Sequence, residues 1–123
     1  ERVRTSINPY NINSFSLTVG SLVIDDKDYN EKNIKTIIQN RDDTAKNLKE
    51  LGFDVLDSSS NFLFIYHEKL KGDELYQKLK QRGILIRHFN KERIKNWNRV
   101  SIGKKEDMDN FIRLTKEILD EKK

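Results

Sequence analysis

The chain has 123 residues, enough for one domain with its own core but too few for two domains of ordinary size. It contains no cysteine, which excludes disulfides and thiolate metal sites and fits a reducing, cytoplasmic location. Its 24 basic and 20 acidic residues are interleaved, so the net charge of +4 indicates a mixed, solvated surface. No apolar run approaches the about 20 residues of a membrane helix, so a membrane is not an expected partner. The interleaved charges likewise argue against nucleic acid as a partner.

Residues 1–27 are predicted to form a connector followed by a helix. The chain begins at Glu1 without an initiator methionine, so we expect it to be a piece of something longer. Pro9 fixes its own backbone and pushes Asn8 towards an extended shape, which predicts an irregular connector as far as Asn13. The segment 14–26 is mostly small and apolar, which favours a helix packed against other protein. On a lone domain this helix would be an awkward exposed surface.

Residues 28–123 are predicted to form one small domain of the α/β class, an α+β sandwich with helices packed on a sheet of three or four strands. Gly52 and Gly83 each follow a predicted helix, at the place where the left-handed conformation that glycine accepts often ends one. The near-continuous apolar run 62–65 predicts a strand that is buried on both faces. The apolar spacing predicts helices at 28–51, 72–82 and 106–119, and strands at 53–56, 61–66, 84–89 and 97–102.

Two of the predicted strands each carry one arginine, Arg87 and, twelve positions further along, Arg99. Arginine is a planar fork of donors that matches a carboxylate or a phosphate bidentately, so the pair is typical of an anion clamp. Small residues at Ser101 and Gly103 would let a ligand approach Arg99 closely. A salt bridge to a nearby acid on the sheet surface is an equally good interpretation of these residues alone, because Asp and Glu are abundant.

The other polar residues are weaker candidates for a functional site. Asn61 enters the apolar core region and must satisfy its amide, either by bonding to backbone at the start of a strand, which we favour, or by contacting a ligand. His67 and His88 lie 21 positions apart, without the close helical spacing of a zinc pair, so no metal site is expected. No phosphate loop, nucleophile elbow or spaced acidic pair is present. The pattern indicates an anion anchor whose reactive group lies elsewhere.

Four short segments carry a family resemblance: Asn8-Pro9-Tyr10-Asn11-Ile12-Asn13, Ser59-Ser60-Asn61-Phe62-Leu63-Phe64, Gly83-Ile84-Leu85-Ile86-Arg87 and Asn98-Arg99-Val100-Ser101-Ile102-Gly103. In this order and spacing they resemble the C-terminal part of histidinol-phosphate aminotransferases, pyridoxal-phosphate enzymes of the aspartate aminotransferase fold, also called fold type I. The resemblance covers essentially the whole chain. Any one segment alone would be weak, and threonine-phosphate decarboxylases and other aminotransferases of the superfamily have similar tails.

The resemblance implies the small C-terminal domain, residues 28–123, of a cytoplasmic, homodimeric transaminase of histidine biosynthesis. Such an enzyme moves an amino group between histidinol phosphate and 2-oxoglutarate or glutamate. In the family, the arginine that matches Arg99 grips the substrate's carboxylate or phosphate, and the one that matches Arg87 assists from the adjacent strand. Asn61 matches a family motif and is a further candidate for substrate binding.

The resemblance also implies what this chain lacks. The lysine that binds pyridoxal 5'-phosphate, and the cofactor's other partners, would lie before Glu1, in an N-terminal domain on which the helix at 14–26 would pack. A lysine nucleophile also needs a desolvated pocket to lower its pKa. The chain alone is therefore expected to hold no catalytic residue, to bind little or no cofactor and to be inactive.

Two other functions are compatible with the residues. The first alternative is a stand-alone α/β module that binds small anions or RNA on its sheet. That module would show surface aromatic residues beside clustered Lys and Arg, and the alternating charges of this sequence argue against it. The second is a regulatory domain that senses an amino acid, which would share the anion clamp but bind its ligand without any other domain.

Overall fold

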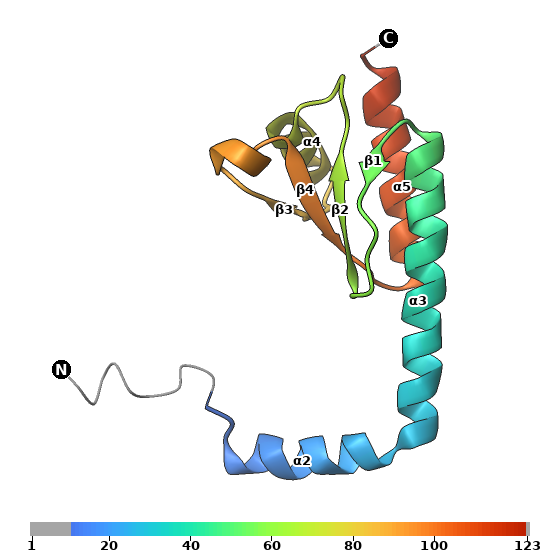
Figure 1. The fold of residues 1–123 in the computed structure, drawn as a ribbon, viewed down its shortest axis with the longest axis vertical. Helices are drawn as coiled ribbons and strands as arrows, with labels where there is room; N and C mark the ends of the chain where they lie inside the picture. Colours follow the sequence, from blue (N-terminus) through green and yellow to red (C-terminus); the bar gives the residue numbers. More distant parts are fainter. Residues whose placement is uncertain (1–10, 123) are drawn as a thin grey trace, which may run out of the picture. The chain divides into compact units, whose positions relative to one another are not determined.

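The computed structural model describes residues 11–122, which fall into two units that meet between Ile34 and Lys35. The first unit contains α2 (Ser14–Asp25) and the start of α3 (Lys27–Glu50). The second contains the rest of α3 and all later elements (Figure 1). These are β1 (Asp54–Val55), β2 (Phe62–Tyr66), α4 (Gly72–Gln81), β3 (Arg87–His88), the short helix η1 (Glu92–Ile94), β4 (Trp97–Ser101) and α5 (Lys105–Asp120). Most of the predicted connector lies outside the described residues.

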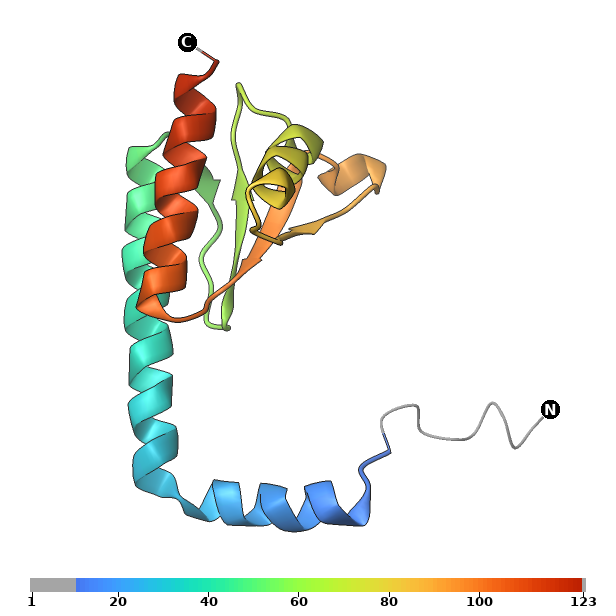
Figure 2. The same cartoon turned by 180° about the vertical axis from the view of Figure 1, so that it is seen from behind.

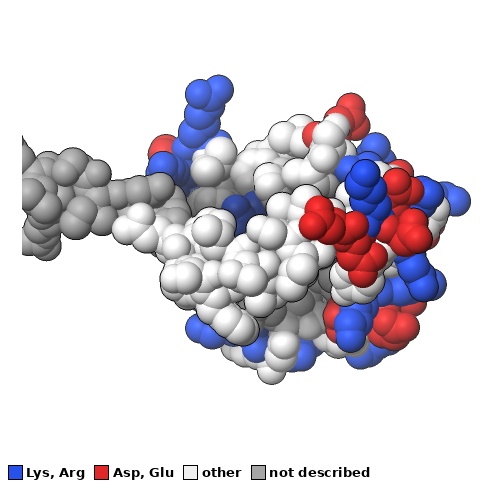
Figure 3. Space-filling view, turned by 90° about the horizontal axis from the view of Figure 1, so that it is seen from below, with Lys and Arg blue, Asp and Glu red and all other residues white. Residues whose placement is uncertain are grey.

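The predicted helix after Asn13 is confirmed as α2, and its side chains are uncovered. Asn13 caps it, because its Oδ1 accepts a hydrogen bond from the backbone N–H of Ser16 at 2.8 Å. No residue of α2 is buried, and Figure 3 shows a largely uncharged surface over this helix, whose one charged residue is Asp25 at its end. Its exposed apolar residues are Phe15, Leu17, Val19, Leu22, Val23 and Ile24. Within residues 11–122, no helix is long and apolar enough to cross a membrane.

The second unit is the predicted sandwich of helices and a sheet. Its four strands lie in the order β1-β2-β4-β3, and every neighbouring pair is antiparallel. Helices α4, α5 and the later part of α3 lie on the same side of the sheet (Figures 1 and 2). The core between them is made of side chains from both layers: Leu48, Leu63, Ile65, Leu75, Leu79, Val100, Phe111 and Ile118 are all nearly inaccessible. Within the second unit, no helix lies over the opposite face of the sheet.

Both predicted helix-ending glycines have the conformation that was expected. Gly52 has φ +86° and Gly83 has φ +83°. In each case the next residue donates its N–H back to the last turn of the helix, from Phe53 to the Leu48 carbonyl at 3.0 Å and from Ile84 to the Leu79 carbonyl at 2.9 Å. The same local chemistry thus reverses the chain twice, once into β1 and once towards β3.

Two expectations about the strands need correction. Residues 84–89 were expected to be a strand, but only Arg87 and His88 pair with β4, and the backbone N–H of Ile84 is still bonded to the end of α4. The apolar run of β2 was expected to be buried on both faces. Instead it alternates, with Leu63 and Ile65 buried and Phe62 exposed, because helices of this chain cover only one face of an antiparallel sheet.

Gly72, the first residue of α4, is predicted to be a sensitive packing position. An added Cβ would lie 2.7 Å from the backbone carbon of Asn96 and 2.8 Å from its oxygen, and backbone cannot swing away. Gly72→Ala should therefore lower the free energy of unfolding by about 1–3 kcal/mol in urea titrations. Gly20→Ala is the matched control, because it adds a methyl group within a helix at a place where no other part of the described chain lies within 4 Å of it. Equal effects of the two substitutions would contradict the packing argument.

Candidate functional site

The structure brings the two predicted arginines together. Arg87 and Arg99 are directly opposite each other on β3 and β4, so their side chains leave the sheet on the same face. This is the face that the helices leave open. Among residues 11–122, neither arginine forms an ion pair, and the ion pairs that are present involve other basic residues. The surface salt bridge that the sequence left open is therefore absent from the described chain.

Each of the two arginines contacts an aromatic ring. The guanidinium carbon of Arg99 lies 5.2 Å from the ring centre of Phe62, and that of Arg87 lies 5.5 Å from the ring centre of Phe89. Such contacts hold a guanidinium plane in place and shield it from water. The aromatic–arginine face, as we call this surface, consists of Phe62, Phe64, Tyr66, Arg87, Phe89, Trp97 and Arg99. It has the surface aromatic residues that the sequence analysis did not anticipate.

The Arg99 side chain is not committed to any other group of the described chain. Its Nε is buried and has no hydrogen-bond partner there. A buried donor without a partner is uncommon, because such a donor loses its bonds to water without replacement. The chain therefore supplies Arg99 with a ring contact and a position in the sheet, and leaves the two terminal nitrogens of its guanidinium group for another molecule.

Asn61 lies at the end of the sheet, immediately before β2. Its backbone carbonyl accepts the N–H of Ile102 at 2.8 Å, which continues the pairing of β2 with β4 by one further bond. Its side chain is exposed, and no hydrogen bond of the described chain joins it to Arg87 or Arg99. The structure thus brings the two arginines together and leaves the amide of Asn61 exposed at the end of the same sheet, without a hydrogen bond to either arginine.

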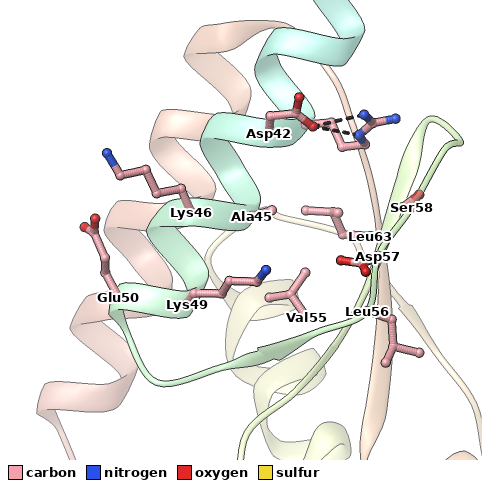
Figure 4. A pocket seen from close by; sticks show the side chains of 11 residues that line it. Asp42, Ala45, Lys46, Lys49, Glu50, Val55, Leu56, Asp57, Ser58 and Leu63 are labelled. Atoms are coloured by element: carbon pink, nitrogen blue, oxygen red, sulfur yellow. Dashed lines mark hydrogen bonds and ion pairs between the residues drawn. The ribbon is translucent and has the colours of Figure 1, made fainter.

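A large hollow of the unit lies away from the arginines. It is an open groove of about 690 Å³ between α3 and β1, and Figure 4 shows Ala45, Val55 and Leu63 on its floor. Lys49 and Asp57 also line it, whereas Arg87, Arg99 and Asn61 do not. Among the described residues, the predicted anion site is accordingly a feature of an open sheet face and not of this groove.

The comparisons with known proteins identify the family. Residues 1–114 match the family model described as aminotransferase class I and II. The chain belongs to this family. It is 43% identical over 119 residues to a histidinol-phosphate aminotransferase of Brachyspira hyodysenteriae, covering 97% of the chain and 34% of that protein. It is 40% identical over 114 residues to one of Lactococcus lactis subsp. lactis, covering 93% of the chain and 32% of that protein.

Solved structures agree with the small-domain fold that the resemblance implied. The crystal structure of the histidinol-phosphate aminotransferase from Clostridium acetobutylicum superposes with a TM-score of 0.80 and 24% sequence identity, over 98% of this chain and 37% of that one. At this identity the likeness concerns the fold alone. The chain spans about a third of the length of the curated relatives it matches, in their C-terminal part.

Aminotransferases of this family depend on pyridoxal phosphate, and the described residues do not fit its anchor. The cofactor is held by a lysine in a desolvated pocket. Every lysine among residues 11–122 is solvent-exposed except Lys78, which is half-buried and paired with Glu74 and Glu121. The same residues contain no group of three His, Asp or Glu side chains that could hold a metal ion.

Sequence reasoning missed one polar residue beside the arginines. Asn98 precedes Arg99 and points to the helix side, where it is 1% exposed and donates from Nδ2 to the Gly72 carbonyl at 2.9 Å. Its signal in the sequence is an asparagine at a position where strand alternation with Val100 calls for an apolar residue. His88, predicted only as an unlikely metal ligand, lies opposite it on β3.

His67 is a structural histidine at the other end of the sheet. Its Nδ1 accepts the backbone N–H of Lys69 at 3.1 Å, and its ring packs against Phe53 at 4.8 Å between ring centres. Burial of the ring lowers the pKa of His67 below its usual value. A hydrogen bond to the Leu51 carbonyl opposes this effect, and the nearby Lys69 adds to it. Because Nδ1 accepts a hydrogen bond, protonation of the ring would remove that bond.

The lowered pKa of His67 predicts a loss of stability in mild acid. Between the folded-state pKa and the unfolded value of about 6.5, the unfolded chain binds more protons, so the free energy of unfolding falls as the pH drops below about 6.5. Urea titrations at a series of pH values would measure this slope. His67→Gln cannot titrate, and its curve should be flatter over the same range. Parallel curves for the two proteins would contradict the assignment.

Proposed function

We propose that this chain is the C-terminal part of a pyridoxal-phosphate-dependent histidinol-phosphate aminotransferase, and that Arg99 and Arg87 bind the anionic group of its substrate. One observation carries the proposal: the two arginines oppose each other on an open sheet face, without an acidic partner in the described chain. The relatives that are 43% and 40% identical are named histidinol-phosphate aminotransferases, which supports this substrate.

The electrostatics of the pair favour an anionic ligand. Like charges directly opposite each other on neighbouring strands repel and are destabilising. An anion bound between them attracts both charges and so offsets that repulsion. The buried Nε of Arg99 is shielded from solvent, so a carboxylate or phosphate would meet its two terminal nitrogens. Phe62 and Phe89 restrict the guanidinium planes before the ligand arrives, which lowers the entropy lost on binding.

In the proposed enzyme this chain orients the substrate and the rest of the polypeptide holds the cofactor. The chain covers about a third of its relatives, and the described lysines do not fit the cofactor's anchor. Fixing the anionic end of a substrate supplies the part of catalysis that comes from positioning. We propose Asn61 as a substrate contact at the edge of this site, through its exposed amide. The chain by itself would be inactive.

Arg99 is predicted to be needed for substrate binding in the complete aminotransferase. Arg99→Lys keeps the charge but loses the planar fork, and should lower kcat/KM for histidinol phosphate about 100-fold or more, because each hydrogen bond from a charged donor contributes about 1.5–3 kcal/mol. The absorbance of the bound cofactor should stay normal, since Arg99 would bind substrate and not cofactor. Steady-state kinetics and a cofactor spectrum on the same preparation test both statements.

A matched control keeps this experiment selective. Arg113→Lys alters an arginine on the surface of α5 that pairs with Glu117, and should leave the kinetics unchanged. Wild-type kinetics for Arg99→Lys would contradict the anion clamp. If the chain also retarded RNA in a salt-dependent manner, the RNA-binding alternative would gain support, because aromatic residues beside arginine on a sheet are what such modules use.

We further propose that α2 packs on the cofactor-binding part of the enzyme. A helix with no buried residue, whose one charged residue is its last, Asp25, exposes a large apolar surface, which soluble proteins usually cover. The length of the relatives supports such a partner, since about two thirds of each lies outside the match. A cytoplasmic homodimer remains our expectation for the complete protein.

The α2 proposal predicts a specific weakening of association between the two parts of the enzyme. Leu22→Glu places a charge in the exposed apolar surface of α2 and should raise the Kd of this chain for the separately produced N-terminal part at least tenfold, which calorimetry would measure. Leu56→Glu is the control, because Leu56 is also an exposed leucine but lies after β1. Equal affinities for the two variants would rule out α2 as the docking element.

A further inference from the structure

The register of β3 depends on very few contacts. β3 has two residues, and its register with β4 consists of two opposed pairs, Arg87 with Arg99 and His88 with Asn98. The first pair opposes two positive charges, which disfavours the very alignment that the proposed anion site needs. The second pair is linked by a hydrogen bond between side chains, Nδ1 of His88 and Oδ1 of Asn98 at 3.2 Å.

Asn98 joins three elements through one buried amide. Its Nδ2 donates to the carbonyl of Gly72, at the start of α4, and its Oδ1 faces His88 on β3. Since the amide nitrogen is used by a carbonyl, Oδ1 is the acceptor, and Nδ1 of His88 carries the proton. The His88 ring also stacks on Tyr76 of α4, with ring centres 5.9 Å apart and planes at 24°. Both partners of the hydrogen bond are thus held against the same helix.

We propose that Asn98 is a positioning residue: through His88 it holds β3 in the register that places Arg87 opposite Arg99. That the two arginines bind an anion rests on the proposed function. The register of β3 with β4 is observed and does not depend on that function. Asn98 does not touch the substrate in this account, because its side chain leaves β4 on the helix side of the sheet. It acts by keeping Arg87 in place against the repulsion of Arg99.

The register can be tested by NMR on this chain. In the wild type we expect cross-strand contacts between the backbones of residues 87 and 99, and a His88 ring that is protonated at Nδ1. Asn98→Leu removes both amide bonds, and should lose the contacts and the Nδ1 proton preference. Asn98→Asp keeps an acceptor for His88 but has no donor for Gly72, so it should keep the cross-strand contacts between residues 87 and 99. If Asn98→Leu does not fold, this second variant still tests the proposal.

Asn40→Leu is the matched control for a general loss of stability. Asn40 is also a buried amide, and its Nδ2 donates to the Gly103 carbonyl at 3.0 Å, far from β3 in the chain. This variant should be destabilised and yet retain the contacts between residues 87 and 99. Retention of those contacts in Asn98→Leu, or their loss in Asn98→Asp or Asn40→Leu, would overturn the proposal.

A double-mutant cycle in the complete enzyme tests the link to binding. If Asn98 acts through Arg87, then Asn98→Leu and Arg87→Ala should each raise KM for histidinol phosphate by a similar factor, about tenfold, and the double variant by no more than either alone. Multiplying effects would mean that Asn98 does not act through Arg87. An unchanged KM in Arg87→Ala would instead reject the proposed role of Arg87, while the NMR contacts would still decide the register.

Discussion

The antiparallel pairing of β2 with β4 is the constraint on which the rest of this unit depends. Five opposed pairs, from Phe62 with Ser101 to Tyr66 with Trp97, fix which side chains face the helices and which face outward. Leu63 and Val100 thereby enter the core, while Phe64 and Arg99 leave on the open face. A shift by one residue would exchange the two sets. The core and the candidate site are therefore two consequences of one register.

The candidate site lies where this register is least supported. β4 is held by five pairs to β2 on one side but by only two to β3 on the other, and one of those two opposes like charges. Functional sites typically contain such locally unfavourable arrangements, here two arginines held side by side, and other contacts offset their cost in stability. Here the offset comes from the buried amide of Asn98 and from the rings that contact the two arginines.

The sequence could predict those parts of the fold that depend on local chemistry. The helices and the turns at Gly52 and Gly83 follow from spacing and backbone preference, whereas the shared face of Arg87 and Arg99 depends on the register of β3 with β4, which the spacing does not fix. The tie between Asn98 and Gly72 could not be predicted, because it joins positions 26 apart that only the packed fold brings together. The double burial predicted for β2 was wrong for a different reason: an apolar strand shows that its side chains can be covered, not which part of a protein covers them.

The proposed function accounts for the aromatic residues on the open face of the sheet. Phe62, Phe64 and Trp97 would be unusual on the surface of an independent domain, yet they suit a face that the rest of an aminotransferase covers. Covering it would also remove water from Arg87 and Arg99, and the attraction between a guanidinium and an anion grows as the surrounding dielectric constant falls. An enclosed face of this composition would bind a substrate anion more strongly than the exposed face can. The apolar rings are therefore as much a part of the proposed site as the two charges.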